Sequence, residues 1–212
     1  DDADPDVQDG SISRPFKTVN AGLNAAEEGN IIYIYDGVYE ESITVEKSNL
    51  TIIGESNQKT VLYQPVSDRG YANRALAIYG NNVTVKNMRI SNSFVTIGRG
   101  NGTYNNHVVL EDNIIVGDPV SGQILVGVYY ADDVHIRNNI IYGNNLSQVG
   151  VFTYTTTKVY IVNNVITDCS YWGVSGNYYS WPALANNLFY SNGTVRTYAS
   201  LGGSWVWEDK GY

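Results

Sequence analysis

Apolar and polar residues alternate in short runs that recur along most of the chain. In "VHIRNNIIYGNN" (residues 134–145), Val134 and Ile136 alternate with His135 and Arg137. A period of two with many β-branched residues predicts a strand with one buried face. A polar pair, usually Asn-Asn, follows the strand, and a second short apolar run comes after the pair.

This pattern repeats about every 25 residues. The units are separated by steps of 33, 25, 26, 25 and 23 residues when they are aligned on the first position of the polar pair, which is held by Gly54, Asn87, Asp112, Asn138, Asn163 and Asn186. A self-similar period of this length, built from short strands with no helix between them, predicts a parallel β-helix solenoid. Because one coil cannot bury its apolar face alone, the stacked coils form the core.

The second residue of each polar pair is predicted to build a ladder inside the solenoid. Asn tolerates the left-handed backbone that a sharp bend needs. Stacked coils place equivalent residues about 4.8 Å apart, so their amides can bond to one another. We assign this structural role, rather than a catalytic one, to Asn113, Asn139, Asn164 and Asn187.

The two ends of the chain depart from the repeat. "PFKTVNAGLNAAEEG" has apolar residues near helical spacing, with Thr18 as the N-cap and Gly29 as the stop. We predict a single domain made of an acidic segment (1–14), a capping helix (15–30), coils (31–200) and a C-terminal tail or cap (201–212).

The tail carries Trp205 and Trp207 on either side of Val206 in a strand-like run. Three explanations stay open. The run folds over the last coil, the chain is a fragment of a longer solenoid, or the open end docks on another copy through the two tryptophans.

The opening "DGSISRPFKTVNAGLNAAEEGNIIYIYDGVYEESITV" resembles that of pectin-lyase-like proteins, and the later coils resemble the parallel β-helix repeats of surface proteins. The resemblance rests on Pro15, Phe16, Thr18, Ala25, Gly29, Ile32, Ile34, Gly37, Tyr39 and Glu40. It implies an all-β, right-handed parallel β-helix solenoid with a short N-terminal capping helix. It does not specify an activity, because the superfamily includes polysaccharide lyases, hydrolases, esterases, adhesins and non-catalytic surface proteins.

Composition and charge limit the classes of partner and the cellular locations that agree with the sequence. The formal net charge of −8 argues against nucleic acid, since no basic patch is available to neutralise phosphates. No apolar run is long enough to span a bilayer. We expect an extracellular or cell-surface location, with which five glycosylation sequons agree, at Asn49, Asn82, Asn101, Asn145 and Asn192.

The outward positions of the repeated strand hold the charged residues. His107 and His135 fall in different columns of the stack, so no metal pair is expected. Opposite charges on neighbouring coils are typical of cross-strand ion pairs. The two charged columns are Lys86, Glu111, Arg137, Val162 and Asn82, His107, Asp133, Lys158.

We assign no catalytic residue from the sequence. In a lyase of the superfamily, the resemblance implies a base at Arg137 or His135 and calcium held by Glu111, Asp132 and Asp133. No cofactor other than such a calcium ion is expected, and no metal site is assigned. An esterase would need paired aspartates with an arginine on one face, and the sequence does not present that set.

Aromatic residues gather at the predicted ends of the third strand in each unit. The chain has 18 tyrosines and 4 tryptophans. Aromatic faces with polar tips suit both sugar rings and protein interfaces. The candidates for glycan contact are Tyr79, Tyr129, Tyr130, Tyr154, Tyr178, Tyr179 and Trp181.

These observations favour a structural, assembly or glycan-contacting β-helix protein without a catalytic site. Its partner would be a polysaccharide or glycan, or copies of itself joined end to end in a filament. The alternative is a polysaccharide lyase or glycoside hydrolase acting on acidic polysaccharide, although a charge of −8 would repel a polyanion unless calcium intervened. A targeting or adhesion module from a larger enzyme is the third hypothesis.

Overall fold

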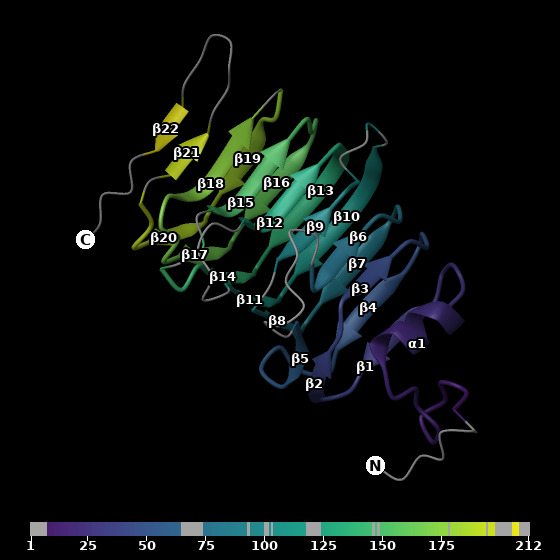
Figure 1. Cartoon of the computed structure of the whole chain (residues 1–212). Coiled ribbons are helices and arrows are strands. Elements are labelled where there is room, and N and C mark those ends of the chain that lie inside the picture. Colours follow the sequence, from purple (N-terminus) through teal and green to yellow (C-terminus); the bar gives the residue numbers. More distant parts are fainter. Residues whose placement is uncertain are drawn as a thin grey trace.

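The structure is a computed structural model of the chain. It describes residues 8–64, 74–92, 94–99, 102, 104–117, 124–145, 147, 149–177 and 179–193, and the backbone of 195–197 and 205–207. Within these residues short strands stack into three parallel sheets of 7, 7 and 6 strands, with one short helix at the N-terminal end (Figure 1). The prediction of a parallel β-helix is therefore confirmed.

Six coils contribute one strand to each sheet, and within the described residues the last coil adds a strand to the first two sheets only. The first sheet consists of β1 (Ile31–Ile34), β4 (Thr51–Gly54), β7 (Val83–Lys86), β10 (Asn105–Glu111), β13 (Ala131–Arg137), β16 (Val159–Val162) and β19 (Pro182–Ala185). The second consists of β2 (Gly37–Glu40), β5 (Thr60–Tyr63), β8 (Arg89–Ser91), β11 (Ile114–Val116), β14 (Ile140–Tyr142), β17 (Val165–Thr167) and β20 (Leu188–Tyr190). The third consists of β3 (Ile43–Val45), β6 (Leu76–Ile78), β9 (Val95–Ile97), β12 (Ile124–Tyr129), β15 (Val149–Tyr154) and β18 (Trp172–Asn177).

The register brings equivalent residues of successive repeats side by side. Val108 pairs with Val83 on one side and Val134 on the other. Leu110 pairs with Ile136 in the same way. All five side chains are 0 % exposed, so the alternating apolar positions of the sequence form the core of the solenoid.

The bend after each strand of the first sheet uses a left-handed residue. The first positions of the polar pairs have φ between 53° and 57° at Asn87, Asp112, Asn138, Asn163 and Asn186. Gly54 holds this place in the earlier coil for a different reason. A Cβ there would lie 2.3 Å from the Asn87 carbonyl oxygen, so the two coils approach too closely for any side chain.

The second positions of the polar pairs form a hydrogen-bonded column inside the bend. The Asn113 amide donates to Asn139 Oδ1 (3.2 Å), Asn139 donates to Asn164 (3.0 Å), and Asn164 donates to Asn187 (3.0 Å). The first three residues are 1 % exposed, whereas Asn187 in the last coil is half-buried. We call these four residues the Asn ladder.

Helix α1 (Val19–Ala25) packs at the N-terminal end of the solenoid and adds Val19 and Leu23 to the core (Figure 1). It is shorter than the predicted helix over 15–30. Thr18 is its N-cap, with Oγ1 accepting from Ala21 N at 3.1 Å. The helix ends at Ala25 rather than near Gly29.

Two charged side chains from the first coil hold the ends of α1. The Glu41 carboxylate accepts from Val19 N (2.8 Å) and Asn20 N (2.9 Å). Lys47 Nζ donates to three carbonyls at the C-terminal end, including Ala26 O at 2.6 Å. Both charges complement the helix dipole. The acid of the "GVYEE" stretch that contacts the helix is therefore Glu41.

The C-terminal end differs from the coils. The short strands β21 (Val195–Thr197) and β22 (Trp205–Trp207) pair antiparallel, at the end of the molecule away from α1 (Figure 1). The side chains of Trp205 and Trp207 lie outside the described residues, so their proposed interface stays a prediction. No helix among the described residues is long and apolar enough to cross a membrane.

Candidate functional site

Two left-handed residues place functional side chains on the outer face of the first sheet. His107 in β10 (φ 55°) and Asp133 in β13 (φ 57°) lie one above the other, between the register pairs Asn106–Asp132 and Val108–Val134. Left-handed backbone is unusual for a non-glycine residue and common for Asp, Asn and His.

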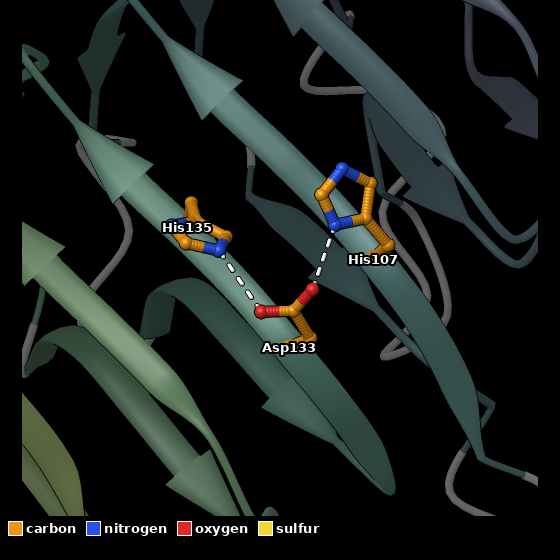
Figure 2. A group of neighbouring side chains, drawn as sticks. All are labelled: His107, Asp133 and His135. Carbon is orange, nitrogen blue, oxygen red and sulfur yellow. Dashed lines mark hydrogen bonds and ion pairs between the residues drawn. The ribbon is translucent and has the colours of Figure 1, made fainter.

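These residues form a cluster with His135. His107 Nδ1 lies 2.7 Å from Asp133 Oδ2, and His135 Nε2 lies 3.0 Å from Asp133 Oδ1 (Figure 2). The hydrogen bond with His107 lowers the pKa of Asp133, and His135 acts in the same direction. The chain has 2 histidines, so both of them belong to this cluster.

The two histidines, for which no metal pair is expected from the sequence, both contact Asp133. They do lie in different columns, as the sequence indicates. Asp133 connects them because it shares a column with His107 and a strand with His135. The three side chains are accessible, with exposed fractions of 52 % for His107, 37 % for Asp133 and 30 % for His135.

A column of alternating charges runs beside the cluster. Glu111 lies between two cations, with Lys86 Nζ at 3.6 Å and Arg137 Nη2 at 2.6 Å. Arg137 also donates through Nε at 2.7 Å. Only 14 % of the Glu111 side chain is exposed, so this carboxylate fixes the position of the Arg137 guanidinium.

His135 of the cluster and Glu111 and Arg137 of the charged column line an open depression of about 420 Å³. The His135 ring stacks on Tyr160 with centroids 4.8 Å apart and an interplanar angle of 21°. The depression is therefore bordered by an imidazole, a phenol ring and a guanidinium, and its lining residues are Glu111, His135, Arg137, Asn138, Tyr160, Val162 and Asn163.

The three carboxylates proposed for calcium have separate partners. Glu111 pairs with Arg137, and Asp133 contacts the two imidazoles. Asp132 accepts from Thr157 Oγ1 and lies 4.0 Å from Lys158 Nζ. Calcium binding by this set stays a prediction.

Several predicted glycan-contacting aromatics lie together at the end of the third sheet. Tyr154 is 6.4 Å from Tyr129 and 5.8 Å from Tyr130 between ring centroids. The Arg99 guanidinium lies 4.5 Å from the centroid of Tyr79. Burial raises the pKa of Tyr129.

The other aromatic candidates fall elsewhere. Tyr179 and Trp181 belong to the later bend and are 71 % and 53 % exposed, and Tyr178 lies outside the described residues. The sequence analysis missed Tyr104, which lies 6.0 Å from Tyr130. Tyr160 had no predicted role, although the register pairs it directly with His135 in the same column, one coil further on.

The sequon asparagines differ in their surroundings. Asn82 Nδ2 donates to Asn49 Oδ1 (2.9 Å), and Asn192 Nδ2 donates to Ile166 O (2.8 Å). Asn145 is exposed, and Asn101 lies outside the described residues. Glycosylation of all five stays a prediction.

Fold and site together define a parallel β-helix of the pectin-lyase-like class, with a polar and aromatic outer face on its first sheet. The family model described as Pectinesterase matches residues 7–112, which is half of the chain. The chain belongs to the pectinesterase family. His107 and Glu111 lie within the matched residues, whereas Asp133, His135 and Arg137 lie beyond them.

Similar proteins occur in Arabidopsis thaliana. Probable pectinesterase/pectinesterase inhibitor 58 is 35 % identical over 92 residues, which cover 38 % of this chain and 16 % of the relative. Probable pectinesterase/pectinesterase inhibitor 23 is 33 % identical over 98 residues, which cover 41 % of this chain and 17 % of the relative. The matches thus span less than a fifth of the length of these relatives.

The family corrects the favoured functional interpretation. The sequence analysis prefers a structural or assembly role without catalysis, and membership of the pectinesterase family contradicts that preference. The alternative interpretation, an enzyme acting on acidic polysaccharide, agrees better with the family. The outward columns of the sequence do not present two aspartates paired with an arginine, which is why an esterase was not expected.

Proposed function

We propose that this chain is a carbohydrate esterase that hydrolyses ester groups on a polysaccharide of the pectin type, outside the cell or at its surface. The observation that carries the proposal is the depression shared by His135, Arg137 and Tyr160 in a chain of the pectinesterase family. These residues offer three different functions on one accessible face: a base, a cation and an aromatic platform.

Binding would use the cation and the rings. Arg137 uses one edge of its guanidinium, formed by Nε and Nη2, to contact Glu111. A guanidinium has five N–H donors, so others remain for a uronate carboxylate or ester carbonyl. Tyr160 presents a ring on which a sugar can pack. Tyr130 lies directly before β13, so the aromatic group could extend this contact along a polymer.

Catalysis would use an imidazole oriented by Asp133. When His135 Nε2–H donates to Asp133, Nδ1 is free to act as a general base. Nδ1 takes a proton from water while the water oxygen attacks the ester carbonyl carbon. The tetrahedral intermediate then expels the alkoxide, which receives that proton and leaves as the alcohol. The products are a carboxylic acid group on the polymer and one alcohol molecule.

The overall charge agrees with an esterified substrate better than with a free polyacid. Repulsion from a net charge of −8 acts on carboxylates, and an esterified uronate has none to repel. Each hydrolysis step creates one negative charge on the polymer. The product is therefore repelled more strongly than the substrate, which favours its release.

The test is release of methanol from methyl-esterified polygalacturonate, together with binding of the same polymer. We expect Arg137→Gln and Tyr160→Ala to lower kcat/KM at least about tenfold, since each removes a contact to the substrate. Lys86→Gln is the matched control, because Lys86 pairs with Glu111 but does not line the depression. No methanol from the wild-type chain, or an equal loss in all three variants, would refute the proposal.

A further inference from the structure

The described part of the chain has one cluster whose atoms meet the requirements of a metal site. His107 Nδ1, Asp133 Oδ and His135 Nε2 all lie within 4.8 Å of one another. In Figure 2 both imidazoles turn a ring nitrogen toward the same carboxylate, one from β10 and one from β13. We propose that His107, Asp133 and His135 bind one divalent transition-metal ion of the zinc type.

The distances require little rearrangement. A tetrahedral zinc ion with bonds of about 2.0–2.2 Å holds its ligand atoms about 3.4 Å apart. The nitrogen–oxygen distances in the cluster are 2.7 and 3.0 Å, so small side-chain rotations would open the space for the ion. All three side chains are partly exposed, which leaves room for these rotations and an entry path.

The donor set selects the class of metal. Two imidazole nitrogens and one carboxylate are ligands typical of zinc and its neighbours, whereas calcium and magnesium prefer oxygen donors. Three protein ligands leave one coordination position open to water, as in catalytic zinc sites. The site would therefore hold a zinc-type ion in preference to the calcium that the sequence analysis considered.

The surroundings leave Asp133 available for a metal. Among the described residues, the nearby cations are engaged with other acids: Arg137 pairs with Glu111, and Lys158 lies closest to Asp132. No lysine or arginine ion pair to Asp133 occurs in this part of the chain. Stacking on Tyr160 restricts the His135 ring, which reduces the freedom lost when a ligand is fixed.

This metal site is argued from its ligands and does not rest on the proposed esterase function. If both proposals hold, His135 Nε2 would bind the ion and Nδ1 would carry the ring proton, so a metal-bound water would replace Nδ1 as the source of the attacking hydroxide. Zinc lowers the pKa of such a water to about 7, so it supplies hydroxide for ester hydrolysis.

Binding of ZnCl₂ to the tag-free chain, measured by isothermal titration calorimetry, is the first experiment. We expect one ion per chain, and the d–d absorption bands of Co²⁺ in the same site report its coordination. His107→Asn and Asp133→Asn should each weaken zinc binding by at least the 10–100-fold that loss of a supporting group costs in metal sites. Asn already adopts this backbone conformation at Asn82, one coil below His107, so both variants suit the fold.

Asp132→Asn is the matched control, because it removes the neighbouring negative charge and leaves the three ligands in place. It should bind zinc like the wild type, and circular-dichroism melting in EDTA checks that every variant folds. Absence of zinc binding, equal binding by His107→Asn, or binding of Ca²⁺ in preference to Zn²⁺ would overturn the metal site. Zinc binding without methanol release would leave the metal site standing and refute the esterase.

Discussion

The inner and outer faces of the first sheet follow different rules, although the same strands build both. Down the inner face, successive coils repeat one residue type at Val83, Val108, Val134 and Val159, all 0–1 % exposed. Down the outer face, the register aligns residues that change from coil to coil: Lys86, Glu111, Arg137 and Val162. A repeating fold constrains the interior of every coil equally, because each coil packs on nearly identical neighbours.

The outer face is therefore where one coil can differ from the next without loss of the fold. The chain places its histidines there, at two adjacent coils. We therefore expect substitutions inside the solenoid to alter stability and substitutions on the outer face to alter binding.

Replacing Asn139 with Leu should lower the free energy of unfolding by about 1–3 kcal/mol, measured by urea denaturation. The change removes the acceptor of Asn113 N and Nδ2 and the donor to Leu110 O (2.8 Å). These buried groups would lose their partners. Asn187→Leu is the control, because Asn187 ends the Asn ladder and is half-buried; its cost should be smaller. Equal effects at the two sites would contradict a ladder that stabilises by burial.

Inside the solenoid, the buried thiol of Cys169 should make the free energy of unfolding fall as the pH rises. Burial raises the pKa of Cys169 to about 12, whereas an unfolded thiol titrates near 8.5. The folded chain keeps this proton while the unfolded chain loses it, so the thiol's contribution is complete below about pH 8.5 and is lost as the pH rises toward 12.

Between pH 8 and 10 the loss should be about 1–2 kcal/mol. The quantity to measure is the stability difference between wild type and Cys169→Ala at each pH, since other groups then cancel. A difference that does not change with pH would mean that the thiol is not protected from solvent in the folded chain.

On the outer face, Arg137→Gln should change the free energy of unfolding by no more than about 0.5 kcal/mol. Nearly half of the Arg137 side chain is exposed, at 48 %, and Glu111 keeps its contact with Lys86. The same variant should lower kcat/KM for polysaccharide hydrolysis at least about tenfold. A stability loss as large as that of Asn139→Leu would show that this ion pair belongs to the fold and would remove the contrast between the two faces.

Much of the fold could be predicted from the sequence, because the same strand and bend pattern occurs in every repeat and each occurrence supports the others. A period of two gives the strands, and a period near 25 residues gives the stacking. The polar pair marks the bend, where Asn138 is left-handed and Asn139 is buried. The N-cap at Thr18 agrees with the sequence, whereas the helix ends at Ala25 and not near Gly29 as the sequence predicts. Lys47, more than twenty residues away, takes the C-terminal carbonyls in place of a stop at Gly29.

The site required the tertiary structure. Aligning the repeats groups equivalent positions of successive coils into columns. His107 and His135 are not equivalent positions, so this alignment puts them in different columns. The left-handed backbone at His107 and Asp133 lets side chains from different columns converge, and a repeat does not report on such diagonal contacts. The sequence by itself thus determined the solenoid, its core and its bends, because these depend on periodic burial. Only the tertiary structure decided which outer side chains meet, because that depends on side-chain direction across neighbouring coils.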